Sequence, residues 1–421
     1  MTGIMQVMLG GFSTASAINF MGSLYSASSD SANAIATDAS NNEYICGVSG
    51  TSLIVAKYTA AGTLSWQMSL TGGAGASANG IAVDSSSNVY VCGLYDSTSI
   101  LLAKYNSAGT LQWQRTLNGT GYEEGNAVSI SPAGDVYICG YSNSTGTLDS
   151  IIAKYDSSGT IQWKNNLSIS ATFVATSIAT DSSSNVYVCG YGTIGGGAND
   201  IYLVKYNSAG TLQWQKYLYT TGNDFSNGIT VSSAGDIYIS GFGTPAVDQL
   251  GLIAKYDSSG TLQWQRTLAS VGNNVQMYGI STDSAGNVYA CGRYGATLVG
   301  IIVKYNSSGA IQWQRTVSTS VGCQLYSIYI GALGNVCVSG SINTNGTPDM
   351  FTLVVPNNGT LTGTYTLNGN SITYAASSFT DVAGTLISAT MSATSSTSSL
   401  TSATSTLTSA TSSLSSAVVL L

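Results

Sequence analysis

Six of the eight lysines of this chain stand at one position of an internal repeat. Each is followed by a Tyr, and an aromatic Trp stands nine residues after each Lys. The six are Lys57, Lys104, Lys154, Lys205, Lys255 and Lys304. If the repeats form a ring, six ammonium groups at one depth predict a site for an anionic ligand, a glycan or a protein partner. The alternative is structural, with each stem lying along the neighbouring repeat and each ammonium capping backbone carbonyl groups.

The other reactive side chains do not form a catalytic or metal-binding pattern. The chain has no His, and its Asp residues lack the D-x-D-x-D-G spacing of a calcium loop. Of the four arginines, Arg115, Arg266 and Arg315 share one repeat position, two residues after a Trp, and Arg293 lies elsewhere. We therefore predict a protein that is not an enzyme and that has no catalytic residues, no metal and no cofactor.

Composition restricts the class of partner. Charged residues make up 7% of the 421 residues, and 19 acidic against 12 basic side chains give a net charge of −7. Such a chain lacks the basic surface that nucleic-acid binding needs. No apolar run approaches the ~20 residues of a membrane-spanning helix, so we expect no membrane span. Residues 1–17 contain no basic segment and predict an N-terminal extension rather than a secretory signal.

Five of the seven cysteines occupy one repeat position, within the phrase (V/I/A)-C-G, as at Cys46 and Cys291. Ser240 and Ser339 fill that position in the two other copies. A disulfide needs Cα atoms within about 7 Å, which equivalent positions of different copies do not offer. We expect small, buried, free thiols, which favour folding in a reducing compartment.

Two phrases alternate with a period of about 50 residues, AKYNSAGTLQWQRTL and IAVDSSSNVYVCG, and each has seven copies. Every unit offers four short strands, such as GIAVD, NVYVCGL, ILLAKY and LQWQRTL, joined by turns rich in Ser, Asn and Gly. Four strands in ~50 residues are typical of a propeller blade. The sequence thus predicts an all-β fold with a seven-bladed β-propeller over residues 18–368 and a low-complexity tail over residues 369–421.

Two segments are candidates for the strand that closes the ring. Residues 18–24 align with the Trp-containing strand and place Phe20 in the Trp position. An eroded last copy has Val354 in the Lys position and Gly363 in the Trp position, so residues 361–367 are the alternative. Closure by either segment would remove free sheet edges.

The repeat resembles the bacterial β-propeller repeat called SBBP. That pattern runs through an Asp, an apolar strand, a Lys, a Gly turn, a Trp and a D-x-x-G-N-x-Y strand. Asp149, Asp200 and Asp349, each five residues before the Lys position, and DSAGNVYACG over 283–292 fit it. The resemblance covers residues 18 to about 368 and implies the fold rather than a function, because propellers host binding, scaffolding and catalysis alike.

Two enzyme motifs are superficially similar to the G-T-L-Q-W stretch. Its spacing departs from the Asp-box of sialidases, and the arginines are too scattered to bind a substrate carboxylate. It also looks like the Trp docking motif of quinoprotein propellers, but no vicinal cysteines occur. Better candidates for binding are loop insertions rich in Gly, Thr and Asn, which would contact sugar hydroxyl groups or simply be solvated. They are Asn118 to Gly125, Tyr191 to Asp200, Gly241 to Gly251 and Ser341 to Asp349.

The tail shows a seven-residue period. From about residue 386 it contains Ser, Thr and Ala and no charge. Leu386, Leu400, Leu407 and Leu414 are spaced by multiples of seven, with Ala393 between the first two, and small residues follow three positions later, which is the a/d pattern of a coiled coil. Ser and Thr are mediocre helix formers. A helical homo-oligomeric stem, a β-structured stem and a disordered tail therefore stay open.

These features predict a non-enzymatic structural or attachment protein of a phage or virus particle, such as a fibre, spike or capsid decoration. The propeller would bind a host-surface glycan or neighbouring subunits, the tail would bind particle subunits or itself, and the location would be the virion surface. Two alternatives stay open. One is a bacterial ligand-binding propeller at the cell surface or outside the cell, and the other is a glycan-active enzyme with its site in the loops.

Overall fold

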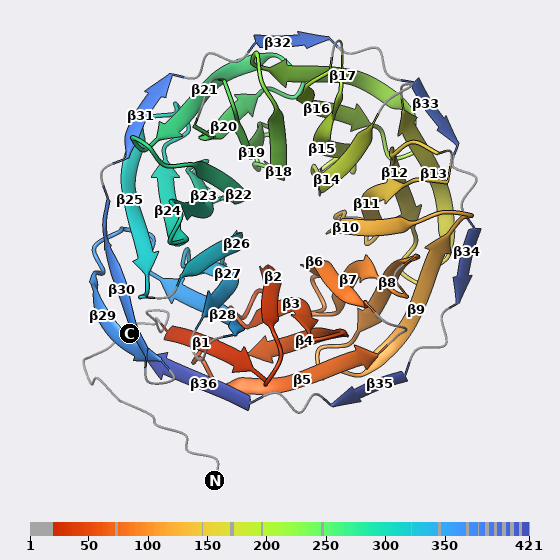
Figure 1. The fold of residues 1–421 in the computed structure, drawn as a ribbon. Coiled ribbons are helices and arrows are strands. Elements are labelled where there is room, and N and C mark those ends of the chain that lie inside the picture. The colour runs from red at the N-terminus through yellow and green to blue at the C-terminus, as the bar shows by residue number, and fades with distance from the viewer. Residues whose placement is uncertain are drawn as a thin grey trace.

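The protein forms an all-β ring of seven sheets around a central channel, as the computed structural model shows (Figure 1). The structure describes residues 20–71, 75–96, 98–144, 146–168, 172–194, 197–245, 248–320, 322–343, 347–367, 370–377, 379–383, 387–390, 394–397, 401–404, 408–411 and 415–420. None of these residues belongs to a helix long and apolar enough to cross a membrane. The predicted seven-bladed propeller is confirmed.

Each blade has four antiparallel strands that follow one another from the channel outward. Blades 1 to 4 contain β2 (Asp30–Thr37), β3 (Glu43–Ser49), β4 (Ser52–Tyr58) and β5 (Leu64–Thr71); β6 (Ser77–Val83), β7 (Val89–Leu94), β8 (Ile100–Tyr105) and β9 (Leu111–Asn118); β10 (Glu123–Ile130), β11 (Val136–Ser142), β12 (Asp149–Tyr155) and β13 (Ile161–Ser168); β14 (Phe173–Thr180), β15 (Val186–Thr193), β16 (Asn199–Tyr206) and β17 (Leu212–Tyr219). Blades 5 to 7 contain β18 (Asp224–Val231), β19 (Ile237–Gly243), β20 (Leu250–Tyr256) and β21 (Leu262–Ala269); β22 (Val275–Thr282), β23 (Val288–Tyr294), β24 (Val299–Tyr305) and β25 (Ile311–Ser318); β26 (Cys323–Ile330), β27 (Val336–Asn343), β28 (Pro348–Val355) and β1 (Phe20–Tyr25).

The N-terminal strand closes the ring. β1 pairs antiparallel with β28, so the fourth strand of blade 7 comes from the start of the chain. The competing segment near residue 363 forms β29 (Gly363–Leu367), which pairs with β30 (Asn370–Ala376) at the outer edge of blade 6. The choice between the two segments that the sequence left open is thereby decided for β1.

The core lies between neighbouring blades. The third strand of a blade is buried on both faces, as in β8, because the blades on either side cover it. Each seam between two blades holds one apolar cluster, such as that of Tyr44, Cys46, Val91 and Tyr105 between blades 1 and 2. The Gly of the repeated C-G phrase is required by the close approach of strand 1, because a Cβ on Gly47 would lie 1.8 Å from the carbonyl oxygen of Ser31.

The C-terminal residues add a further strand to every blade. β30 lies on β25, and β31 (Thr380–Ala383), β32 (Ile387–Thr390), β33 (Thr394–Thr397), β34 (Thr401–Thr404), β35 (Thr408–Thr411) and β36 (Ser415–Leu420) pair with β21, β17, β13, β9, β5 and β1. In Figure 1 these segments circle the outside of the ring. The described parts of the tail are therefore strands and not a heptad helix. Leu386, Leu400, Leu407 and Leu414 lie outside the described residues.

Candidate functional site

The antiparallel order gives the propeller two distinct faces. The connections between strands 1 and 2 and between strands 3 and 4 lie on one face, which we call the turn face. The connections between strands 2 and 3 and between successive blades lie on the other, the loop face. The four insertions singled out in the sequence all belong to the loop face, because each spans a connection of the second kind.

The repeated lysines lie in the seams towards the turn face and bind the next blade. Lys57 Nζ donates to the carbonyl oxygen of Ser107 at 3.3 Å and lies 5.1 Å from the ring centre of Tyr44. The equivalent bonds of Lys104, Lys154, Lys205, Lys255 and Lys304 reach Ser157, Ser208, Ser258, Ser307 and Asn357 at 3.3–3.4 Å. The six ammonium groups are thus distributed one per seam. Carbonyl capping describes this geometry, and a ligand role for the ring stays a prediction.

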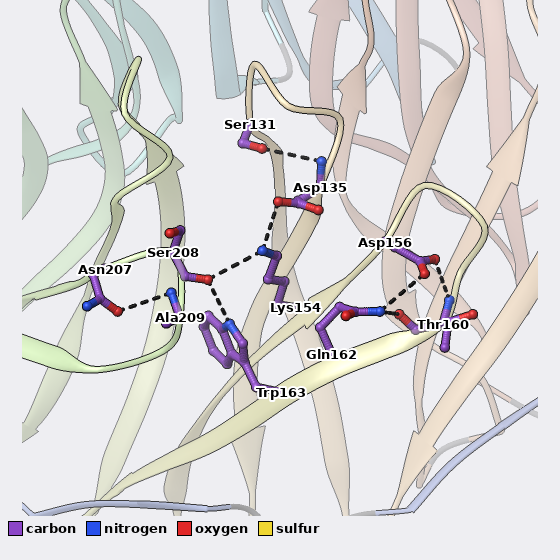
Figure 2. A network of polar contacts seen from close by, with 10 residues as sticks. All are labelled: Ser131, Asp135, Lys154, Asp156, Thr160, Gln162, Trp163, Asn207, Ser208 and Ala209. Carbon is purple, nitrogen blue, oxygen red and sulfur yellow. Dashed lines mark hydrogen bonds and ion pairs between the residues drawn. The ribbon is translucent and has the colours of Figure 1, made fainter.

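A Trp reinforces every one of these contacts. Figure 2 shows the seam between blades 3 and 4, where the Trp163 indole N–H and the Lys154 ammonium both donate to the carbonyl oxygen of Ser208. Lys154 also pairs with Asp135 at 2.8 Å. Gly210 in the same turn has a φ of +81°, and a Cβ there would lie 2.8 Å from the Trp163 ring. We call this unit, the Lys and Trp of one blade holding the turn of the next, the clasp.

Three of the four arginines extend the clasp. Arg115 Nε donates to the carbonyl oxygen of Gly159 at 2.8 Å, and Arg266 Nε donates to that of Gly309 at 2.7 Å. Arg315 bonds the equivalent carbonyl group of the last turn. The repeated cations therefore serve the seams, which leaves Arg293 as the arginine with a different role.

The seam between blades 7 and 1 has a different chemistry. Val354 and Phe20 occupy the Lys and Trp positions and have no side-chain donor, and the Phe20 ring packs where Trp does elsewhere, against Gly62. Glu43 on β3 is buried in this seam and accepts a hydrogen bond from Thr352 Oγ1 of β28 at 3.1 Å. Burial raises the pKa of Glu43 to about 7.

The channel is lined by a residue that bulges from strand 1 in each blade. The register of strands 1 and 2 shifts at this position in every blade, which turns the bulged side chain toward the axis. Asn33, Asn79, Asn126 and Asn227 donate from Nδ2 to a carbonyl oxygen of the next blade at 2.7–3.0 Å. Thr176, Tyr278 and Tyr326 complete the set, and these seven residues surround a cavity of about 210 Å³.

Above the bulged residues, the channel widens into a mouth on the loop face, with a cavity of about 480 Å³. Each blade has one cross-strand pair at this end of strands 1 and 2, made of the residue two positions before the bulge and the residue after the repeated Gly. The pairs of blades 3 and 4 line the cavity itself. The seven pairs all differ. They are Ser31 and Val48, Ser77 and Leu94, Glu124 and Tyr141, Val174 and Tyr191, Phe225 and Phe242, Gln276 and Arg293, and Gln324 and Ser341.

Blade 3 supplies a carboxylate to the mouth. Glu124 Oε2 accepts hydrogen bonds from the hydroxyl groups of Tyr122 at 2.7 Å and Tyr141 at 2.8 Å, and Oε1 accepts one from Asn79 Nδ2 at 2.9 Å. Burial, with the bond to Glu124, raises the pKa of Tyr122 to about 12. Both phenols therefore stay protonated near neutral pH and hold the carboxylate in a fixed orientation. Tyr191 of blade 4 lines the same cavity, and its ring meets the Phe225 ring edge to face with 4.8 Å between the ring centres.

Blades 6 and 7 supply a guanidinium group and amides. Arg293 donates from Nε to Gln276 Oε1 at 2.8 Å and from Nη1 to Gln324 Oε1 at 2.6 Å. The Tyr278 hydroxyl also donates to Gln276 Oε1, at 2.6 Å, and the Tyr278 ring lies 5.7 Å from that of Tyr326. These bonds occupy two of the five N–H donors of the guanidinium, so the group is oriented and retains donors for a ligand.

Part of this site was indicated by the sequence analysis. Glu124 and Tyr191 fall within two of the predicted loop insertions, and Arg293 is the arginine that left the shared repeat position. The sequence analysis did not identify the residues of the mouth as one group. The position two residues before the bulge and the position after the repeated Gly vary from blade to blade, and this variation within a regular repeat is the signal that would have identified them. The five cysteines at the repeat position are free and buried, as predicted, and so are Cys323 and Cys337. Within the described part of the chain, no three His, Cys, Asp or Glu side chains lie together as metal ligands would.

Comparisons with solved structures find proteins of low sequence identity to this chain. A computed comparison with solved structures finds virginiamycin B lyase from Staphylococcus aureus, an inactive form with quinupristin, at 12% identity and a TM-score of 0.51, over 80% of this chain and 99% of that one. The WD40 domain of Toxoplasma gondii coronin has 11% identity and a TM-score of 0.46, over 84% and 90%. A glucose dehydrogenase has 10% identity and a TM-score of 0.42, over 66% and 96%.

These likenesses concern the fold alone. A search of curated proteins gives no match to the sequence. The family model of the SBBP beta-propeller repeat matches residues 69–94, which run from the end of β5 through β6 and β7. This is the repeat type that the Lys, Trp and D-x-x-G-N-x-Y positions resembled. The chain is therefore a β-propeller that contains the SBBP repeat.

Proposed function

We propose that this protein is a non-enzymatic binding propeller whose channel mouth takes a neutral, hydroxyl-rich ligand, such as the terminal sugars of a surface glycan. The observation that supports this is the set of seven different pairs at the mouth. The clasp positions repeat in six of the seven blades because those six seams are held by the same bonds. An asymmetric ligand, by contrast, requires a different group from each blade.

The chemistry of the mouth suits sugars. Tyr rings offer flat apolar faces to the C–H faces of a pyranose, and their hydroxyl groups bond to its polar rim. Glu124 accepts and Arg293 donates, so the two sides of the mouth provide complementary partners for hydroxyl groups. Their charges are opposite, which favours a neutral ligand over a strongly charged one. The cavity volume of about 480 Å³ falls within the usual range for small-molecule sites.

The arrangement favours binding over glycoside hydrolysis. Most glycosidases use two carboxyl groups that lie about 5 to 9.5 Å apart across the scissile bond. Among the described residues that line the mouth cavity, Glu124 is the one carboxylate. Its two oxygens already accept three hydrogen bonds. A carboxylate held in this way is suited to orienting a hydroxyl group rather than to exchanging a proton.

We further propose that the binding serves attachment, with the protein at the surface of a phage or virus particle as a fibre, spike or capsid decoration. In this proposal the loop face is turned outward and the turn face toward the particle. Seven free, buried thiols suit assembly in a reducing compartment. Antibodies against the propeller should label intact purified particles. Absence of labelling, with the protein found on a bacterial surface instead, would favour the cell-surface alternative.

A glycan array with the purified full chain tests the ligand class. Arg293→Ser installs the residue that blade 7 has at the equivalent position, and Tyr326→Thr installs that of blade 4, so both changes have precedents in the same ring. We expect each variant to bind the selected glycan at least about ten-fold more weakly. Leu333→Ser, at an exposed position on the turn face, is the matched control and should leave binding unchanged.

Three results would refute the proposal: no neutral glycan bound, equal binding by both mouth variants, or cleavage of the bound glycan by the wild-type chain. The last result would favour the enzyme alternative. Circular dichroism of each variant excludes unfolding as the cause of lost binding.

A further inference from the structure

The tail contacts the propeller at a constant interval. Its paired positions Thr373, Thr380, Ile387, Thr394, Thr401, Thr408 and Ser415 follow one another every seven residues. The number of contacts equals the number of blades. The order of the blades they meet is 6, 5, 4, 3, 2, 1 and 7, which runs once around the ring in the direction opposite to the chain order of the blades.

The register of these contacts is the same on every blade. Each of the seven tail positions pairs with the last residue of the outer strand that it meets, as Thr401 does with Asn118 and Ser415 with Tyr25. Pairing then continues over four residues in β31 to β35 and over six in β36. Such regularity is not expected of a disordered tail that touches the surface at random.

The spacing sets a limit on what the tail can encircle. Seven extended residues span at most about 23 Å, so seven repeats can surround a ring of at most roughly 50 Å across. The pairings show that one repeat, a four-residue strand plus a three-residue interval, leads from one blade to the next. A coiled-coil heptad would use the same period of seven but would leave the blade edges uncovered.

From this match we infer that the tail is an intramolecular belt. The outer edges of the seven blades form one continuous strand-accepting surface, and its occupant is the seven-residue repeat of this same chain. The outer strands would otherwise present rows of unpaired N–H and C=O groups, which invite pairing with other molecules. The belt covers these edges and ends on β1, the strand that closes the ring.

The last strand of the belt, β36, pairs with the strand that closes the ring. β1 is bound to blade 7 by β28 on one side and by β36 on the other. The belt also returns to its start, since β36 and β29 are neighbours. Opening the ring at β1 would thus require β36 to separate as well. This inference is independent of the ligand site at the mouth.

Deleting one repeat tests the inference in the otherwise intact chain. Removal of residues 398–404 moves each later segment forward by one blade, so β35 would cover β9, β36 would cover β5, and the outer edge of β1 would be left bare. Duplicating residues 398–404 is the matched control, because it leaves every edge covered. Hydrogen exchange read by mass spectrometry and light scattering are the two measurements.

We expect all three proteins to be monomers, with tail amides protected in the wild-type chain. In the deletion variant, amides of β1 that face away from β28 should exchange at least about ten-fold faster, while those of β5 and β9 keep their protection. The duplication should change neither. Unprotected tail amides in the wild-type chain would overturn the belt. So would a wild-type oligomer, because the tail would then occupy the edges of a second copy.

Discussion

Replacing Glu43 by Val should stabilise the protein, and the gain should grow with pH. Glu43 is 1% exposed and lies in the seam between blades 7 and 1. Its Oε2 accepts from Thr352, and no described residue bonds Oε1. The other blades place a fully buried apolar residue at this position, and these residues are Val89, Val136, Val186, Ile237, Val288 and Val336. Val at position 43 therefore fits the geometry of the blade.

The magnitude follows from the pKa. Burial raises the pKa of Glu43 from 4.5 to about 7, and hydrogen bonds from Cys337 and Thr352 offset part of the effect of burial. Between these pH values the folded protein holds a proton that the unfolded chain has released. The free energy of unfolding therefore falls as pH rises through this range and is constant above it. The difference between the two pKa values corresponds to about 3 kcal/mol.

Thermal unfolding of both proteins near pH 4 and near pH 8 measures this effect. An unfolding entropy of ~2.1 cal/mol/K per residue converts about 3 kcal/mol into about 3 °C of Tm for this chain. The Tm of Glu43→Val should therefore exceed that of the wild type by about 3 °C more near pH 8 than near pH 4. Burial also raises the pKa values of Asp200 and Asp224 to about 6, so only the difference between wild type and variant isolates Glu43. Val288→Glu, which places a carboxyl group at the equivalent position of another seam, should lower Tm relative to the wild type, and by more near pH 8 than near pH 4. An equal Tm difference at both pH values would refute the reasoning.

Three further predictions concern the repeated positions. Trp163→Phe removes the indole N–H of one clasp and should cost about 1 kcal/mol in thermal unfolding. Gly109→Ala places a Cβ 2.9 Å from the Trp66 ring at a φ of +83°, whereas Gly134→Ala has the same backbone strain but open space around the added Cβ. Gly109→Ala should therefore lower Tm clearly more than Gly134→Ala does. Equal losses of Tm in the two variants would contradict the contact between the turn and the Trp of the clasp. Burial raises the pKa of Cys291 to about 12 and raises the pKa values of the other six thiols as well. A thiol reagent should therefore label the folded protein slowly, and it should label seven sites once the protein is denatured.

The blades were predictable because the residues that hold the seams are the repeat itself. Lys154, Trp163 and Gly210 each make one bond or contact to an adjacent blade, so selection for the seam appears in the sequence as a period of about 50 residues. The closing strand was harder to assign. Phe20 and Gly363 both stand in the Trp position, and only the pairing of β1 with β28 distinguishes them.

The mouth was not predictable as a set, because its residues come from distant parts of the chain. Glu124 and Arg293 come to the same end of the channel only when blades 3 and 6 stand around one axis. The tail had a different problem. A period of seven fits a heptad helix as well as one strand per blade. The deciding facts, the number of blades and the pairing of the tail with their outer strands, are properties of the folded ring and not of the tail sequence.

The elements that are not repeated converge on blade 7. Six seams have the clasp of Lys and Trp, and the seam between blades 7 and 1 has Val354, Phe20 and the buried Glu43 instead. This seam loses stability as pH rises from about 4.5 to about 7, because the unfolded chain releases the proton that buried Glu43 retains. The terminal strand β36 pairs with β1 at this same blade. If the ring opens anywhere, it should open here, and the final strand of the belt covers that place.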